Sequence, residues 1–209
     1  MNPTRRSLLV SAIPLLLSPR VALSGPMSQA SSIYQALFAY FLAQPGTPRV
    51  LVIEEFAPSI EEVLPPLPAI PEANFPAMSP ADKLKGLYPA ATETLRTEFL
   101  RILARGGAID RNQFAAIGDV KIVWLSRQQK AEIFDTDPQL NAWEQFHTRF
   151  PQSKSLLRIT LPAIDLDRQT ALLYLGWSCG GTCGGGSLFL FAHVKGGWRL
   201  MHEQQIWVA

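Results

Sequence analysis

Hydrophobic residues at helical spacing predict two helices in the first half of the chain. Between Ser28 and Ala43 the apolar positions recur three and four residues apart, at Ile33, Tyr34, Leu37, Phe38, Phe41 and Leu42. A second helix is predicted from Ser79-Pro80, a capping residue followed by a first-turn proline, to Arg105, with a kink or restart at Pro89. Gly106-Gly107 is expected to end it.

Shorter apolar runs lie between and after these helices. Arg49–Glu54 is apolar and β-branched and predicts a buried strand, whereas Val120–Leu125 fits either a strand or the start of an apolar helix. Seven prolines fall between Pro58 and Pro80, which predicts an extended loop over residues 57–80. A third helix is predicted from Asp137-Pro138 through Trp143, closed by Pro151.

The last third of the chain has the composition of an antiparallel sheet. Four runs rich in Leu, Phe, Trp and β-branched residues predict strands at Leu156–Leu161, Thr170–Trp177, Ser187–Val194 and Trp198–Val208. The last two form a hairpin, for which a Lys195-Gly196 turn is favoured over Gly196-Gly197 and sets Phe191 opposite Leu200. We therefore predict an α+β fold, with N-terminal helices on one face of a C-terminal antiparallel sheet of four to five strands.

The N-terminus has the pattern of a bacterial export signal. Arg5-Arg6 precedes an uncharged apolar run, Leu8–Leu17, that at about ten residues is too short to span a membrane. Ala22-Leu23-Ser24 offers small residues for cleavage, which predicts a signal peptide at 1–24 and a single domain at 25–209, exported to the periplasm or secreted. The arginine pair fits a twin-arginine signal or an ordinary secretory signal, and both interpretations stay open.

Cleavage would make the chain nearly neutral. The whole sequence has 19 basic and 17 acidic residues, and residues 1–24 contain Arg5, Arg6 and Arg20 but no acid, which leaves 16 basic residues. A chain without a basic stripe is not expected to bind nucleic acid or anionic membranes. After Leu17 no run is long and apolar enough to span a bilayer, so we expect no transmembrane segment after signal removal.

The segment 179–186 holds the only two cysteines and five glycines, between two predicted strands. Along an extended strand Cys179 and Cys183 would lie about 13 Å apart, beyond the reach of a disulfide, so the chain must reverse between them. Gly180 and Gly181 would allow this reversal through positive φ, and the glycines Gly184, Gly185 and Gly186 would allow re-entry into a strand or form an anion-binding nest.

Three kinds of chemistry fit the cysteine pair, and a structural disulfide is favoured. Export and an even cysteine count indicate a disulfide between Cys179 and Cys183. A redox dithiol usually has two intervening residues at a helix N-terminus, whereas here three residues intervene between strands. Zinc would need two further ligands, so no metal or other cofactor is predicted.

Aromatic and histidine residues are the remaining candidates for a site. Trp143, Trp177 and Trp198 are expected in the core or around a pocket between helices and sheet, with His193 and His202 on opposite arms of the hairpin, where they could approach each other. Asp165 and Asp167 could act as paired carboxylates or occupy a turn. The nucleophile motif G-x-S-x-G is absent, and no catalytic residue is assigned.

Several segments together resemble a family of exported bacterial proteins without an established activity. The resemblance rests on Trp143-Glu144-Gln145-Phe146, Phe150-Pro151-Gln152-Ser153, Gln169-Thr170-Ala171-Leu172, Cys179-Gly180-Gly181-Thr182-Cys183-Gly184, Gly197-Trp198-Arg199-Leu200 and Trp207. It covers the C-terminal third, and His147, Phe150 and Thr182 depart from the family pattern. The closing strands also resemble those of cystatin-like and NTF2-like domains, an architectural likeness that implies no function.

Two functions are compatible with these observations. The first is a non-enzymatic exported domain that binds an unknown protein or small ligand and is stabilised by the Cys179–Cys183 disulfide. The second is a thiol-disulfide or cysteine-dependent enzyme that uses the same pair. The two are separated by the reduction potential of the cysteine pair.

Overall fold

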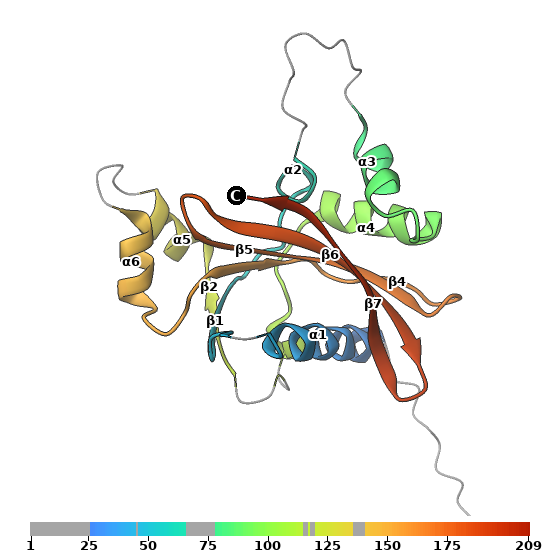
Figure 1. Ribbon diagram of the computed structural model, residues 1–209, viewed down its shortest axis with the longest axis horizontal. Helices are drawn as coiled ribbons and strands as arrows, with labels where there is room; N and C mark the ends of the chain where they lie inside the picture. Colours follow the sequence, from blue (N-terminus) through green and yellow to red (C-terminus); the bar gives the residue numbers. More distant parts are fainter. Residues whose placement is uncertain (1–25, 45, 66–77, 115–116, 118–119, 136–140) are drawn as a thin grey trace, which may run out of the picture.

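One seven-stranded sheet forms the centre of the molecule (Figure 1). The computed structural model describes residues 26–44, 46–65, 78–114, 117, 120–135 and 141–209. The strand order is β2-β1-β3-β5-β6-β7, and β4 pairs with β5. The strands are β1 (Val50–Glu54), β2 (Lys121–Leu125), β3 (Leu156–Ile159), β4 (Ala163–Asp165), β5 (Thr170–Gly180), β6 (Cys183–Val194) and β7 (Gly197–Val208).

The predicted α+β fold is confirmed, and two strands from earlier in the chain, β1 and β2, also belong to the sheet. Strands β3 to β7 pair antiparallel, and these five strands are the four predicted runs together with the short strand β4. Strand β1 extends this sheet by pairing parallel with both β3 and β2. The segment Val120–Leu125, which fitted a strand or a helix, contributes the edge strand β2.

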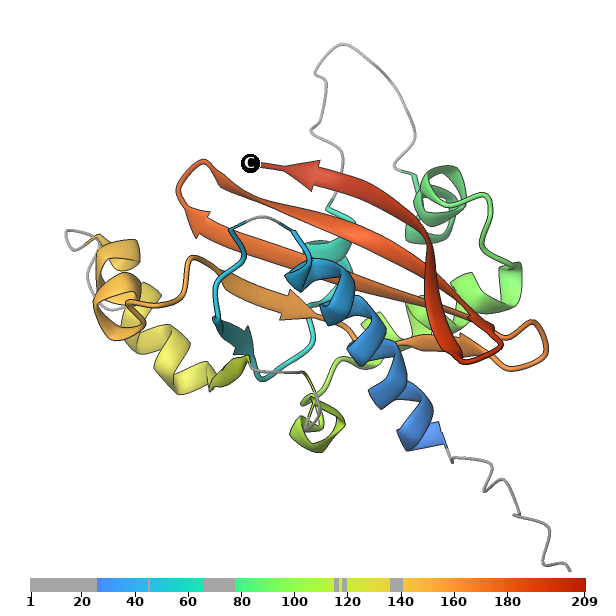
Figure 2. The ribbon, with the colours of Figure 1, turned by 60° about the horizontal axis from the view of Figure 1, so that its bottom comes forward.

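Helices cover both faces of the sheet (Figures 1 and 2). They are α1 (Pro26–Leu42), α2 (Ile60–Val63), α3 (Pro80–Leu87), α4 (Glu93–Arg105), the short 3-10 helix η1 (Arg111–Phe114), α5 (Arg127–Phe134) and α6 (Ala142–Arg149). Helices α1 and η1 pack on one face, here called the α1 face, and α2, α3 and α4 pack on the other, the α4 face. Helices α5 and α6 cover a third core beside β1 and β2.

The expectation that helices pack on only one face is wrong, for a reason visible in β5 and β6. Ala171-Leu172-Leu173-Tyr174-Leu175 and Leu188-Phe189-Leu190-Phe191 are apolar at every position. Because side chains alternate along a strand, such runs place apolar residues on both faces, and each face must be covered. Leu173 and Phe189 accordingly lie in the core under α1, and Leu172 and Leu188 in the core under α4.

Local capping sets the helix boundaries, and the restart predicted at Pro89 is confirmed. The predicted helix from Pro80 to Arg105 is divided at Tyr88–Thr92, because Pro89 interrupts α3 and Thr92 caps α4 through the Leu95 N–H. Gly106 ends α4 with φ 57°, as expected for a glycine after a helix.

The third predicted helix begins at another cap. Asn141 accepts a hydrogen bond from the Trp143 N–H and opens α6, while Asp137-Pro138 lies outside the described residues, as does the predicted signal peptide at 1–24. Besides the 3-10 helix η1, two helices of the described residues were not predicted. One is α5, and the other is α2, within the proline-rich stretch, where Ser59 and Glu62 form a capping box.

The predicted register of the last hairpin is confirmed. Val194 pairs with Gly197, so Lys195-Gly196 is the two-residue turn, and Phe191 pairs with Leu200. Gly196 has φ 99° and Gly197 has φ 134°, values that favour glycine. Two register shifts follow along β7 toward the C-terminus.

Candidate ligand-binding site

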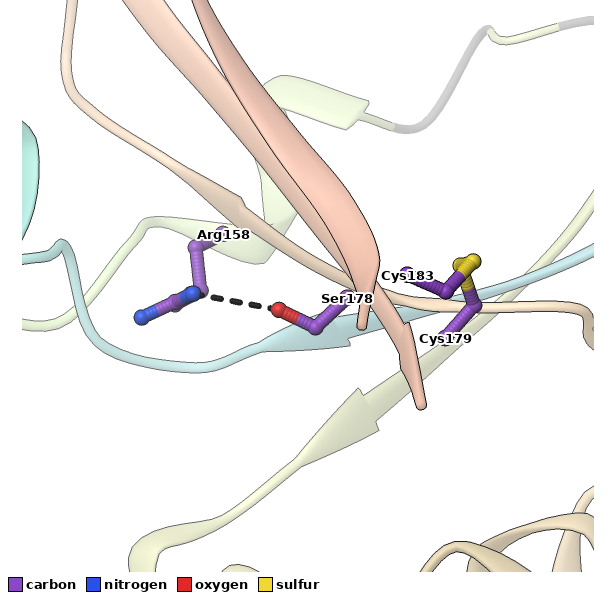
Figure 3. The surroundings of a disulfide bond; sticks show 4 residues. All are labelled: Arg158, Ser178, Cys179 and Cys183. Carbon is purple, nitrogen blue, oxygen red and sulfur yellow. Dashed lines mark hydrogen bonds between the residues drawn. A yellow bond between two sulfur atoms is a disulfide. The ribbon is translucent and has the colours of Figure 1, made fainter. Parts of the chain in front are cut away.

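The cysteine pair lies at the tip of the β5–β6 hairpin. Cys179 and Cys183 form a disulfide with their Cα atoms 5.1 Å apart (Figure 3). Gly180 pairs with Cys183, which leaves Gly181-Thr182 as the turn, and a register shift between Ser178 and Gly180 leaves Cys179 outside the regular pairing. This is the disulfide expected from the sequence, and it is compatible with an oxidising compartment.

The glycines of this segment have a different role from the one expected. Gly180 and Gly181 are not among the positive-φ glycines, so the reversal does not depend on a left-handed conformation. Gly185 and Gly186 lie within β6 and leave room for aromatic rings, which also excludes a nest formed by a loop. A Cβ on Gly186 would lie 2.6 Å from Tyr174 Oη, and one on Gly185 would lie 2.7 Å from Trp177 Cη2.

These contacts fix aromatic side chains on both faces of the sheet. On the α4 face, Trp207 Nε1 donates a hydrogen bond to Tyr174 Oη at 3.0 Å, above the paired glycines Gly176 and Gly186. Burial raises the pKa of Tyr174. On the α1 face, Trp177 packs over its cross-strand partner Gly185 and remains half-buried. The glycine run therefore determines where Trp177 and Tyr174 sit.

A pocket of about 340 Å³ opens beside Trp177 on the α1 face. We call it the aromatic pocket, and it is lined by Tyr40, Phe41, Gln44, Ser155, Leu175, Trp177, Phe189 and Glu203. Helix α1 crosses this face of the sheet, as Figure 2 shows, and its C-terminal end supplies the first two of these side chains. Four aromatic rings from one helix and two strands thus surround a space of the size that small ligands occupy.

One acidic side chain, that of Glu203, lies at the wall of the aromatic pocket. The Tyr40 hydroxyl donates a hydrogen bond to Glu203 Oε2 at 2.7 Å, and this bond raises the pKa of Tyr40. Glu203 is the cross-strand partner of Phe189, so its side chain projects from β7 on the same face. Tyr40 and Phe189 meet edge to face with ring centroids 6.2 Å apart.

A cluster of charged residues lies on the α4 face, between the core under α4 and the core under α5 and α6. Glu54, at the carboxyl end of β1, is 12% exposed and pairs with Lys130 Nζ at 2.9 Å and with Arg158 Nε at 3.9 Å. Arg158 also pairs with Glu62 at 3.4 Å and donates to Ser178 Oγ at 3.2 Å (Figure 3). These pairs hold α2 and α5 against the sheet.

The hollow beside this charged cluster is smaller, about 150 Å³, and includes Glu54, Glu62 and Lys130 in its wall. Arg127 lies over the Phe56 ring, 3.9 Å from its centroid. Glu54, Lys130 and Glu62 already form ion pairs within the charged cluster, so these three side chains of the hollow are not free to bind a ligand. The aromatic pocket is the stronger candidate site.

The five residues proposed from the sequence as a pocket do not come together. Trp143 packs in the third core, with its ring centroid 5.2 Å from that of Phe134, and Trp198 packs on His193 at 5.2 Å near the hairpin turn. His202 lies on the α4 face, where the Tyr88 hydroxyl donates to its carbonyl at 2.8 Å and lies 2.9 Å from Nδ1. Of the five, only Trp177 lines the aromatic pocket.

The two histidines of the hairpin therefore cannot act as a pair. His202 pairs with Leu190, a residue of the core under α4, whereas His193 is three positions further along β6 and contacts Trp198, which packs against the core under α1. Side chains three positions apart on one strand project to opposite faces. Within the described residues no group of three His, Cys, Asp or Glu side chains could hold a metal ion.

Asp165 and Asp167 also lie in different environments. Asp165, in β4, is buried and accepts hydrogen bonds from the Thr92 hydroxyl at 3.0 Å and from the Arg168 N–H at 3.2 Å. It therefore ties the N-terminus of α4 to the sheet, while Asp167 is exposed in the following turn. Asp167 thus occupies the turn that the alternative interpretation of the sequence expected, whereas Asp165 is buried in β4 and has a structural role.

The residues that sequence reasoning missed are those that complete the aromatic pocket, chiefly Tyr40, Phe41, Phe189 and Glu203. Helical periodicity had placed Phe41 on a buried stripe, and nothing local marked it as a pocket residue. No helix in the described part of the chain is long and apolar enough to cross a membrane. Comparisons with protein-family models, curated proteins and solved structures gave no match, so any functional argument depends on the geometry of the site.

Proposed function

We propose that this chain is a non-enzymatic binding domain that acts outside the cytoplasm, in the bacterial periplasm or after secretion. Its ligand is a small molecule that occupies the aromatic pocket. The observation that supports this function is a hollow of about 340 Å³ lined by four aromatic residues and few polar groups. Ligand pockets are usually apolar cavities of this size with a few polar groups that orient the ligand.

The Cys179–Cys183 disulfide has a structural role in this proposal. The bond joins the end of β5, two residues beyond Trp177, to the start of β6. It therefore limits fraying of the strand end that contributes Trp177 to the pocket wall. The export signal expected at residues 1–24 would deliver the chain to a compartment where such a bond persists.

The alternative, a thiol-disulfide enzyme, has less support from the site. Both cysteines lie in or next to strands, so no helix N-terminus is placed to stabilise a thiolate. A measured reduction potential below about −300 mV, with slow reduction by small thiols, is expected for a structural bond. A potential between about −120 and −200 mV with rapid exchange would support the enzyme instead.

Binding in the aromatic pocket is tested with a neutral fluorescent probe, N-phenyl-1-naphthylamine. The purified mature protein should bind it with enhanced emission, because the probe moves from water to an apolar site. The variant Ser155→Phe, which places a ring in the pocket wall, should weaken binding at least tenfold, whereas Thr182→Phe at the exposed hairpin tip should not change it. Circular dichroism confirms that both variants fold.

Equal binding by the two variants would show that the probe binds elsewhere. An absence of binding to the folded wild-type protein would count against a ligand in this pocket.

A further inference from the structure

We infer that the ligand of the aromatic pocket is an organic cation, a small quaternary ammonium or protonated amine. This inference rests on the proposed function, because it assumes that the pocket is a binding site, and it adds the chemical class of the ligand.

The first argument is the kind of side chain that surrounds the space. Tyr40, Phe41, Trp177 and Phe189 come from α1, β5 and β6, and together they are half of the residues that line the pocket. Aromatic rings carry negative charge on their faces and attract a cation within about 6 Å of the ring centre. Several rings around one space form the arrangement by which proteins bind alkylated ammonium groups.

The second argument is the charge of the lining. Glu203 is the single carboxylic acid among the described residues that line the pocket, and no Lys, Arg or His is among them. The Tyr40 hydroxyl holds Glu203 by donating to Oε2 at 2.7 Å, which orders the carboxylate and leaves Oε1 for another partner. An ordered carboxylate beside aromatic rings favours a cation and repels an anion.

The lysine that adjoins the pocket lining in sequence is directed elsewhere. Lys154 precedes Ser155 of the lining, but its Nζ donates to the Gly46 carbonyl at 2.9 Å. Glu203 differs in this respect from Glu54 in the charged cluster on the α4 face, because Glu54 is already paired with Lys130. Glu203 has no such cation among the salt bridges of the described residues.

The test compares choline with 3,3-dimethylbutan-1-ol, its neutral analogue of nearly the same shape. Each compound is titrated into the ¹⁵N-labelled mature protein at constant ionic strength. Binding is followed by the indole N–H signals, with the Trp177 signal identified from the Trp177→Phe variant. Choline should shift the Trp177 signal and bind at least tenfold more tightly than the alcohol, a difference of about 1.4 kcal/mol.

Two variants separate the contributions of charge and shape. Glu203→Gln should weaken choline binding about three- to tenfold and leave the alcohol unchanged, whereas Asp167→Asn, at an exposed turn, should affect neither compound. Trp177→Leu keeps an apolar wall but removes a ring, so it should weaken choline more than the alcohol.

Each outcome decides a different point. Equal affinities for choline and the alcohol, with shifts at Trp177, would overturn the inference of a cation and leave the pocket as a binding site. If neither compound, nor the neutral fluorescent probe, binds to the folded protein, the proposed function fails as well.

Discussion

Gly186→Ala is expected to be the most informative single substitution in the glycine run. Gly186 is buried in β6, where its added Cβ would lie 2.6 Å from Tyr174 Oη and would also overlap Trp207 Nε1. Both rings would have to move, and neither can do so without cost, because Tyr174 is buried in the core under α4 and Trp207 donates its hydrogen bond to the Tyr174 hydroxyl. The substitution therefore tests whether this glycine exists to admit the two rings.

The expected loss of stability follows from three contributions. Overpacking by one methyl group in a filled site costs about 1–3 kcal/mol, and loss of the bond between Trp207 and Tyr174 costs about 1 kcal/mol. Replacing a strand glycine by alanine returns about 0.5–1 kcal/mol of backbone entropy. The net loss is about 2 kcal/mol, which lowers the Tm by about 4–8 °C for a domain of this size.

Urea unfolding followed by circular dichroism measures this loss, with Gly181→Ala as the matched control. Gly181 has no heavy atom within 4 Å of its added Cβ and no positive φ, so its substitution should change the free energy of unfolding by less than about 0.5 kcal/mol. In a double-mutant cycle, Trp207→Ala should reduce the cost of Gly186→Ala, because the two residues are in contact.

Gly186→Ala with wild-type stability would refute the close-approach argument. Equal losses for Gly186→Ala and Gly181→Ala would instead favour a general requirement for glycine in the hairpin.

Two further predictions concern the disulfide and the tyrosines. The double variant Cys179→Ser/Cys183→Ser should fold but lose about 2 kcal/mol in thermal unfolding, because the bond closes a loop with a sequence separation of 4; a variant that is unfolded in native buffer would show that the bond is essential for folding. Burial raises the pKa of Tyr34, Tyr88 and Tyr174 above the usual 10.0, so the unfolded chain releases these protons first and stability falls as the pH rises above about 10. Absorbance at 295 nm should then show these tyrosines ionising together with unfolding, and ionisation near pH 10 in the folded protein would contradict their burial.

The sequence by itself determined the features that depend on residues close together along the chain. The Lys195-Gly196 turn, which the sequence favoured, fixed the β6–β7 register as far as the Phe191–Leu200 pair, while the two register shifts beyond that pair were not predicted. The start of α3 and the end of α4 follow from Ser79-Pro80 and Gly106, which satisfy or end the helical hydrogen bonds. The disulfide follows from the cysteine count and the need to reverse the chain between two strands.

The tertiary structure alone decided what these elements enclose. The aromatic pocket joins Tyr40 in α1 to Trp177 in β5 and Glu203 in β7, both more than a hundred positions further along the chain, and no local pattern records such a contact. The role of Gly185 and Gly186 was hidden for the same reason. In a sequence, a glycine that permits a left-handed turn and a glycine that admits a ring are identical, and only packing against Trp177 and Trp207 distinguishes them.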